Sequence, residues 1–282
     1  AVAALICVIG SVISVHMSGR LTEWTGKRRL VQLPLAGLIT GATIWSTHFI
    51  AMTAYEPGYE HGYEPILTGA SLLVGVLGSF AANAGLAFAR GAAAPVMAGA
   101  IFGMTVSAMH YTGMRAYLLP GTIQWNIGTV IVSVLLGAGL GALSYGLITR
   151  RMRGIPGRVW PALAMVLAIC LMHFTGMSAI EIRLDSSIEV PPKTISDNAM
   201  ALLVFAVTAI ILLIAMASAS IEVNMEGETR HQLNHAATHD PLTGMPNRMW
   251  LTRKLDALKI RLDENETARA AIMTVDLNLF KE

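Results

Sequence analysis

The sequence contains one short phrase three times, as Thr47-His48-Phe49-Ile50-Ala51-Met52, Met109-His110-Tyr111-Thr112-Gly113-Met114 and Met172-His173-Phe174-Thr175-Gly176-Met177. The three histidines follow one another at steps of 62 and 63 residues. Each phrase lies near the end of a long apolar stretch, where a histidine is costly to bury unless it has a partner or a task. The repetition therefore predicts an internally duplicated pair of helices and a shared function for the three histidines.

The composition is that of a membrane protein. Of the 282 residues, 54% are hydrophobic and 13% are charged, and the apolar residues form blocks. A spanning helix needs ~20 mostly apolar residues, so we expect an all-α polytopic protein in contact with a lipid bilayer. The predicted spans, seven in number, are residues 1–18, 34–54, 66–89, 95–118, 124–148, 159–181 and 199–221. The chain begins at Ala1 inside an apolar run, so we expect residues to be missing at its amino end.

Basic residues are distributed unevenly between the connections of these spans. Nine lie after the first, third and fifth spans: Arg20, Lys27, Arg28, Arg29, Arg90, Arg150, Arg151, Arg153 and Arg158. Three lie in the alternate connections: Arg115, Arg183 and Lys193. Because cytoplasmic loops carry the excess of Lys and Arg, we expect the amino end outside the cell and the carboxyl tail in the cytoplasm. All three histidine phrases then lie at one depth, toward the outer ends of spans two, four and six.

Each phrase also carries a second metal-ligand type. A methionine follows the histidine by four residues, so the two side chains share one face of a helix. Imidazole beside thioether favours copper among the transition metals. The predicted copper ligands are His48, Met52, His110, Met114, His173 and Met177. Secondary candidates are Met109, Met172 and Cys170. In the alternative reading, duplication copied a packing arrangement, in which histidine bonds a carbonyl group and methionine fills a gap.

Seven spans with these phrases on the second, fourth and sixth resemble the MHYT integral membrane sensor domain. Its name is spelled by Met109, His110, Tyr111 and Thr112, and the resemblance covers residues 1–222. It implies a sensor in the bacterial inner membrane that binds copper through the histidines and methionines and senses a diatomic gas (O2, CO or NO) or a redox state. The first copy differs from the family phrase, with Thr, Ile and Ala where Met, Thr and Gly are usual.

The chain becomes polar after residue 222, which predicts a solvated signalling linker helix at residues 223–238. Pro241, Gly244 and Pro246 then indicate a structured turn, followed by a helix from about Asn247 to Glu264. Residues 271–278 form a short, largely apolar stretch that ends in an acid, as in a strand. The sequence therefore predicts the start of a soluble α/β domain at residues 239–282.

Two phrases in this tail resemble GGDEF domains, which condense two GTP molecules into cyclic di-GMP. Residues 239–248 resemble the amino-terminal signature of the family, and residues 275–281 resemble its first metal-binding strand. Asp276 matches the magnesium-binding aspartate, whose hard oxygens suit two-metal phosphoryl chemistry. Asn278 differs from a second aspartate that is usual there. The residues given stop at Glu282, before the Gly-Gly-Asp-Glu-Phe turn, so we expect no cyclase activity from them alone.

These observations lead to one main hypothesis and two alternatives. Ligand capture at the copper site changes the packing of spans two, four and six, and the linker helix passes this change to a GGDEF domain that works as a homodimer. The first alternative is a membrane anchor that dimerises a cyclic di-GMP enzyme without any ligand. The second is a metal transporter, which would need charged residues or broken helices at mid-membrane. We expect no nucleic-acid partner.

Overall fold

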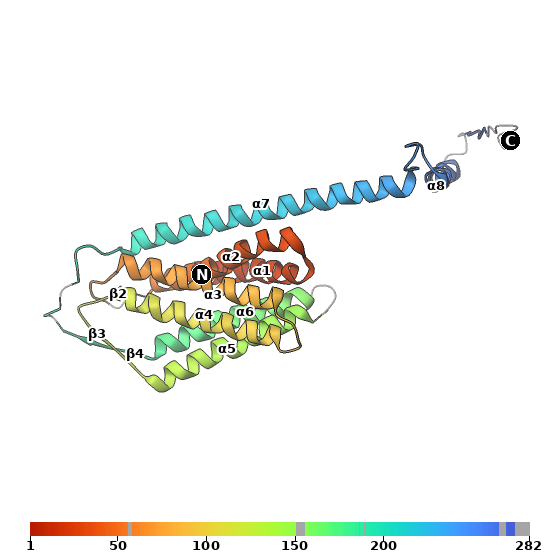
Figure 1. The fold of residues 1–282 in the computed structure, drawn as a ribbon. Helices are drawn as coiled ribbons and strands as arrows, with labels where there is room; N and C mark the ends of the chain where they lie inside the picture. Colours follow the sequence, from red (N-terminus) through yellow and green to blue (C-terminus); the bar gives the residue numbers. More distant parts are fainter. Residues whose placement is uncertain (56–57, 151–155, 186, 189, 265–268, 274–282) are drawn as a thin grey trace. The chain divides into compact units, whose positions relative to one another are not determined.

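The computed structural model describes residues 1–282 except 56–57, 151–155, 186, 189, 265–268 and 274–282. In this described part, seven long helices precede the polar tail (Figure 1). Their bounds are α1 Val2–Glu23, α2 Gly26–Met52, α3 Pro65–Phe88, α4 Ala94–Ala116, α5 Ile127–Thr149, α6 Pro156–Ser178 and α7 Asp197–Thr238. Residues Ala1–Met216 form one compact unit, and residues Ala217–Glu282 form a second unit, which is described by itself below.

Helices α1 to α6 form a closed ring, because each packs against the next along the chain and α6 packs back against α1. Helix α4 also contacts both α2 and α6, so these three helices lie toward the centre. In the apolar part of α2, 78% of the residues are buried, compared with 28% in α3 and 22% in α5. The helices that carry the histidine phrases are therefore the inner ones, and α1, α3 and α5 are the outer ones.

Six helices in the described part are long and apolar enough to cross a membrane, namely α1, α2, α3, α5, α6 from Val159 and α7 up to Ser220. The remaining predicted span, residues 95–118, corresponds to α4, which does not reach the same apolarity because it contains polar residues such as Ser107, His110 and Arg115. With 23 residues it is as long as α5, and it packs between α3 and α5. Six spans are thus supported by length and composition, and the seventh stays a prediction.

Glycines allow the inner and outer helices to touch along their backbones. A Cβ atom at Gly103 of α4 would lie 2.0 Å from the carbonyl oxygen of Gly137 of α5. In the preceding repeat, a Cβ atom at Gly41 of α2 would lie 2.4 Å from the Cα atom of Val76 of α3. Small residues permit this approach in lipid, where hydrophobic burial does not drive association. The glycines therefore set the α2–α3 and α4–α5 distances.

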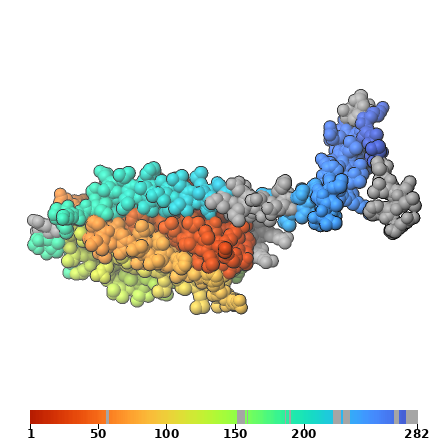
Figure 2. Space-filling model, turned by 45° about the horizontal axis from the view of Figure 1, so that its top comes forward, coloured from red at the N-terminus to blue at the C-terminus, as the bar shows by residue number. Residues whose placement is uncertain are grey.

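Helix α1 occupies the third outer position, which the repeat would give to α7. Helix α3 lies between α2 and α4, α5 lies between α4 and α6, and α1 lies between α6 and α2. The repeat aligns Gly41 and Gly103 with Val166 of α6, whose branched side chain prevents an equally close backbone contact with an outer helix. The first half of α7 packs instead against α1 and α2, where Ile211 joins their buried cluster (Figure 2).

At the end of the ring far from the histidines, the outer helices meet through a buried polar cluster. The Ser18 hydroxyl of α1 donates a 2.6 Å hydrogen bond to Oδ1 of Asn83 of α3, and the Tyr145 hydroxyl of α5 donates one of 3.5 Å to the same atom. Asn83 and Tyr145 are 62 residues apart, so they are equivalent positions of the repeat. The inner helices thus meet at one end of the bundle and the outer helices at the other.

The prediction of an all-α fold misses four short strands at the histidine end. Strand β1 Gly62–Tyr63 pairs with β2 Tyr117–Leu118, and β3 Gly121–Trp125 pairs with β4 Ile180–Leu184, both antiparallel. The predicted span 124–148 is therefore wrong at its start, because residues 124 and 125 belong to β3 and the helix begins at Ile127. The predicted span 159–181 is wrong at its end for the same reason, since β4 begins at Ile180.

The second unit contains the end of α7, a turn and α8 Arg248–Glu264. Residues 223–238, the predicted linker helix, are helical and belong to α7. In the turn, the Asp240 carboxylate accepts hydrogen bonds from the backbone N–H groups of Thr243 and Leu242, which hold the pKa of Asp240 below its usual value. Gly244 has a φ of +70°, a conformation that favours glycine. Of the predicted strand 271–278, residues 271–273 have no regular structure and the rest lies outside the described residues.

The glycine contacts make a direct prediction for stability. We expect Gly103→Ala to destabilise the bundle by about 1–3 kcal/mol, because the added methyl group forces α4 and α5 apart. Gly139→Ala on α5 is the matched control, since its Cβ would meet no atom within 4 Å. Thermal unfolding of the detergent-solubilised protein measures both variants. Equal midpoints for the two would contradict the proposed backbone contact.

Candidate metal centre

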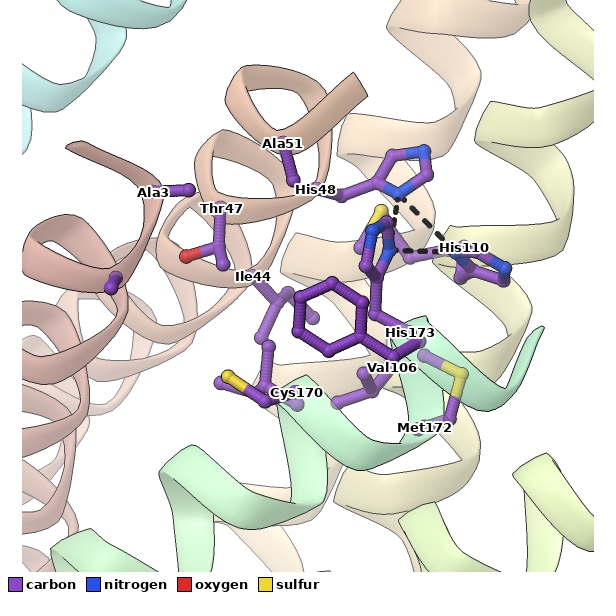
Figure 3. A pocket seen from close by; sticks show the side chains of 14 residues that line it. Ala3, Ile44, Thr47, His48, Ala51, Val106, His110, Cys170, Met172 and His173 are labelled. Carbon is purple, nitrogen blue, oxygen red and sulfur yellow. Dashed lines mark hydrogen bonds between the residues drawn. The ribbon is translucent and has the colours of Figure 1, made fainter. Parts of the chain in front are cut away.

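The three histidines of the repeated phrase meet at the centre of the bundle. His48 comes from α2, His110 from α4 and His173 from α6. Their Nδ1 atoms form a triangle with sides of 3.2, 3.2 and 3.3 Å, and the rings point toward one another (Figure 3). The residues are 3%, 0% and 8% exposed. The structure therefore brings together the three side chains that the repeat selected.

The glycine of the phrase makes room for the neighbouring histidine. A Cβ atom at Gly113 would lie 2.6 Å from Nε2 of His48, and one at Gly176 would lie 2.6 Å from Nε2 of His110. These two Nε2 atoms are buried and have no hydrogen-bond partner among the described residues. Packing against the glycine backbones therefore orients the rings, with Nδ1 toward the centre.

Hydrogen bonding alone cannot satisfy this triangle. In a neutral imidazole each ring nitrogen is either a donor or an acceptor. Each of the three Nδ1 atoms is therefore a donor or an acceptor, and at least two of the three must be the same. The contact between those two brings together two N–H protons or two lone pairs. Protonation of a ring only adds donors. A cation at the centre removes the conflict, because all three Nδ1 lone pairs then face it.

The distances also agree with a shared metal ion. Imidazole nitrogens bind Zn²⁺ at 2.0–2.1 Å, and two such ligands at a tetrahedral angle are ~3.3 Å apart. The observed Nδ1 separations of 3.2–3.3 Å match this value. Helices α2, α4 and α6 thus hold three ligands at the spacing of a metal site without any further movement. The described residues contain one such group of three or more His, Cys, Asp or Glu side chains.

A cavity of about 80 Å³ adjoins the histidines on the side of α1 (Figure 3). Besides the three histidines it is lined by Ala3, Ala4, Ile44, Thr47, Ala51, Val106, Met109, Ile169, Cys170, Met172 and Phe174. Position 51 is Ala where the other copies have glycine, and it lines the cavity. Apart from the histidines, Thr47 and Cys170, the residues that line the cavity are apolar.

The methionines of the phrase differ in their positions. Met109 and Met172, the secondary candidates, line the cavity and pack against Gly75 of α3 and Gly137 of α5. Met52, Met114 and Met177 do not line it, and they belong to the surrounding apolar cluster. Thr47 takes the place of the preceding methionine in the first copy. Methionine ligands therefore stay a prediction, and the residue before each histidine lies nearer the cavity than the one four residues after it.

A polar cluster in the loops next to this site was not apparent from the sequence. Asp197, the first residue of α7, places a carboxylate oxygen 2.9 Å from Nε2 of His61 and accepts a 3.1 Å hydrogen bond from the Tyr63 hydroxyl. Burial and the Asp197 carboxylate both raise the pKa of Tyr63, which therefore remains a donor. No spacing in the sequence links His61 to residue 197.

This cluster connects the histidines to the start of α7. The His48 ring contacts the Phe49 ring edge-on at 4.8 Å, and Phe49 contacts the Tyr63 ring at 5.7 Å between centroids. The backbone of Tyr63 also exchanges two hydrogen bonds with Ile195, two residues before α7. A continuous row of packed groups therefore leads from the candidate metal centre to Asp197.

The repeats found in the structure match a known family. A family model described as "Bacterial signalling protein N terminal repeat", MHYT, matches residues 41–100, 103–158 and 167–226, with one histidine of the triangle in each match. The chain belongs to the MHYT family. The apolar helices and this family indicate a multi-pass membrane protein. No solved structure matches the chain.

Several curated proteins are similar to this MHYT protein. An uncharacterized signaling protein of Caulobacter vibrioides is 35% identical over 78% of this chain and 27% of its own length. The bifunctional diguanylate cyclase/cyclic di-GMP phosphodiesterase MucR of Pseudomonas aeruginosa is 30% identical over 98% of this chain and 42% of its own length. The cyclic di-GMP phosphodiesterase NbdA of the same organism is 28% identical, over 100% and 39% respectively. The chain thus spans less than half the length of these relatives.

The site residues predicted in the polar tail lie outside the described part of the chain. Asp276, predicted to bind magnesium, lies outside the described residues, and so does Asn278. The turn at residues 239–248 is ordered by Asp240 and by Asn247, whose side chain donates a 2.9 Å hydrogen bond to the carbonyl of Ala237. A start of a GGDEF domain here stays a prediction.

The fit between glycine and histidine can be tested without any metal. We expect Gly113→Ala to destabilise the protein by about 1–3 kcal/mol, because the methyl group would displace the buried His48 ring. Gly69→Ala on α3 is the control, since nothing lies within 4 Å of its Cβ position. Thermal unfolding of both variants is the measurement. A Gly113→Ala protein as stable as the control would contradict the packing described here.

Proposed function

We propose that this chain is a copper-binding sensor module of the bacterial inner membrane that regulates cyclic di-GMP metabolism. One observation carries the proposal: three buried imidazole nitrogens from three inner helices lie within 3.3 Å of one another. Such a set is costly in an apolar bundle unless it has a cation to bind. Its repetition in three family matches supports a common task.

The donor set and its surroundings favour copper. Imidazole suits zinc, copper, iron and nickel, and soft sulfur ligands shift the preference toward Cu(I). The thioethers of Met109 and Met172 and the thiol of Cys170 line the same cavity. Met52, Met114 and Met177 remain proposed ligands by the spacing of the phrase. Three neutral imidazoles with a monovalent ion leave a single positive charge in the apolar interior, which costs less than two.

The cavity beside the histidines supports a small molecule as the proposed signal. A metal with three protein ligands keeps a position open for a fourth, and the adjoining space of about 80 Å³ exceeds the ~30 Å³ share of one water molecule in the liquid. A copper ion held there supplies a coordination position and a one-electron redox couple. The apolar lining suits a small uncharged molecule. We therefore propose a diatomic gas (O2, CO or NO) or a redox change as the signal.

The row from His48 through Phe49 and Tyr63 to Asp197 supports a route for that signal. A displaced His48 ring moves Phe49, which packs on Tyr63, and Tyr63 holds the first residue of α7. A ligand shifts such an arrangement only by its differential affinity for two states. Helix α7 continues into the proposed linker at residues 223–238.

The proposed output rests on the relatives and on the tail. MucR and NbdA carry cyclic di-GMP enzyme activities in their names. We propose that a GGDEF domain begins near residue 239, that Asp276 binds Mg²⁺ there, and that the complete domain acts on GTP as a homodimer. The excess of basic residues after α1, α3 and α5 supports an amino end outside and a cytoplasmic tail.

The two alternative functions lack comparable support. A ligand-free dimerising anchor does not explain why three imidazoles share one point. A metal transporter needs charged residues or broken helices at mid-membrane, and the helices that carry the histidines, α2, α4 and α6, are unbroken.

Metal analysis tests the proposed site. We expect the purified membrane protein to retain copper, and His110→Ala and His173→Ala to weaken binding at least ~100-fold, more than the 10–100-fold effect of outer-shell partners. His16→Ala is the matched control, because His16 is exposed on α1 and outside the cavity. Elemental analysis and chelator competition measure the affinity. Unchanged copper binding in the triad variants would refute the site.

The route to α7 has its own test in the full-length protein. We expect Asp197→Ala to keep the copper but to lose the response of cellular cyclic di-GMP to nitric oxide or carbon monoxide, because Tyr63 and His61 no longer hold α7. Asp185→Ala is the control, since Asp185 is exposed and bonds locally to Ser187. A normal response in Asp197→Ala would exclude this route.

A further inference from the structure

The two cysteines of the chain meet although they are 163 residues apart. The Sγ atoms of Cys7 on α1 and Cys170 on α6 are 3.9 Å apart, and Cys7 is fully buried. The sequence contains no other cysteine. The sequence makes Cys170 a secondary ligand candidate for the histidine site, and it gives no role to Cys7. The pairing arises because α1, rather than α7, fills the third outer position of the ring.

The sulfur separation fits two thiolates on one metal ion. Two metal–thiolate bonds of ~2.3 Å can place their sulfur atoms up to ~4.6 Å apart, so thiols separated by 3.9 Å can bind the same ion. A disulfide would need a separation of ~2.0 Å, which these thiols do not have. The helices as they stand are therefore placed for a shared ion.

Unpartnered hydroxyl groups lie beside the thiols. Ser11 follows Cys7 by one helical turn on the same face, and Thr47 of α2 also lies next to the Cys7 thiol. Their residues are 0% and 7% exposed, and neither oxygen has a hydrogen-bond partner among the described residues. Buried hydroxyls are rarely left unpaired. Both can donate to a thiolate, as outer partners of metal ligands commonly do.

One thiol of the pair, that of Cys170, lines the cavity beside the histidines. Cys170 and Thr47 line the same 80 Å³ space as His48, His110 and His173, and Figure 3 shows them on its α1 side. If the proposed function holds, Cu(I) on three neutral imidazoles leaves a charge of +1. Cu(I) on two thiolates has a charge of −1. Opposite charges side by side in an apolar interior stabilise each other strongly.

We propose that Cys7 and Cys170 form a second metal site, for a soft monovalent ion such as Cu(I), next to the histidine site. Binding replaces the two thiol protons, which are released to solvent, by one Cu⁺ ion, and no group changes its oxidation state. Ser11 and Thr47 donate hydrogen bonds to the thiolates. The protein would then hold a pair of ions, one bound by nitrogen and one by sulfur.

The test is a Cu(I) titration of the reduced, full-length membrane protein against a competing chelator under anaerobic conditions. We expect two bound equivalents in the wild type and one in Cys7→Ser/Cys170→Ser, a nearly isosteric double variant. His48→Ala/His110→Ala should also retain one equivalent, now bound by sulfur. X-ray absorption should show two thiolate sulfur neighbours per ion at ~2.3 Å in this variant, and the serine variant should lack this two-thiolate signal.

A second measurement uses the unaltered protein. Because the chain has two cysteines and Cys7 is fully buried, a small, membrane-permeable thiol reagent in a long incubation should label two thiols without metal and none after Cu(I) or Ag(I) is added. Equal stoichiometry in the wild type and the serine variant, or thiols that stay reactive with Cu(I) bound, would overturn the sulfur site. These outcomes depend on the cysteines and not on copper at the histidines. The sulfur site and the proposed function can therefore fail independently.

Discussion

The structure depends on three imidazole rings that share one point in an apolar bundle. Their Nδ1 atoms are too close for any arrangement of protons to satisfy all three contacts, and a bound cation would resolve this conflict. This constraint explains much of the surroundings. The glycine of the second and third phrases is needed because a side chain at Gly113 or Gly176 would collide with a neighbouring histidine ring. The glycines lower on the helices let α2 and α4 pack closely enough on α3 and α5 to close the ring.

The threefold repeat is broken on one side, and the cavity lies on that side. Val166 stands where α2 and α4 have a close-packing glycine, and α1 fills the place that α7 would take. The side of the ring next to α1 therefore carries Cys7, Thr47 and Ala51. On the other two sides, methionine fills the space beside the histidines and glycine packs against a histidine ring. A symmetric bundle would enclose the histidines completely. The irregular face leaves space beside them, and it brings the first half of α7 to the outside of the ring.

The sequence was sufficient to predict the three central histidines of the site, but it was insufficient to predict the residues around them. His48, His110 and His173 could be selected because a period of about 62 residues placed them at one level of equivalent helices. The choice among methionines could not be made by spacing, because the position before the histidine and the position four after it lie on different sides of the inner helices. Cys7, His61 and Asp197 could not be found, since their partners depend on how α1 and the loops pack. The short strands were not predicted, because two to five residues beside a long apolar run have no hydrophobic pattern of their own.

The same arrangement suggests how a buried site can control a distant domain. Histidine, phenylalanine and tyrosine rings connect the centre to Asp197, and Asp197 begins the helix that leads to the proposed enzyme. The central claim is that one ion joins the three inner helices. An anomalous-difference map at the copper absorption edge, from crystals of the copper-loaded protein, tests it most directly. The account predicts a peak ~2 Å from all three Nδ1 atoms. A map without a peak between these rings would contradict it.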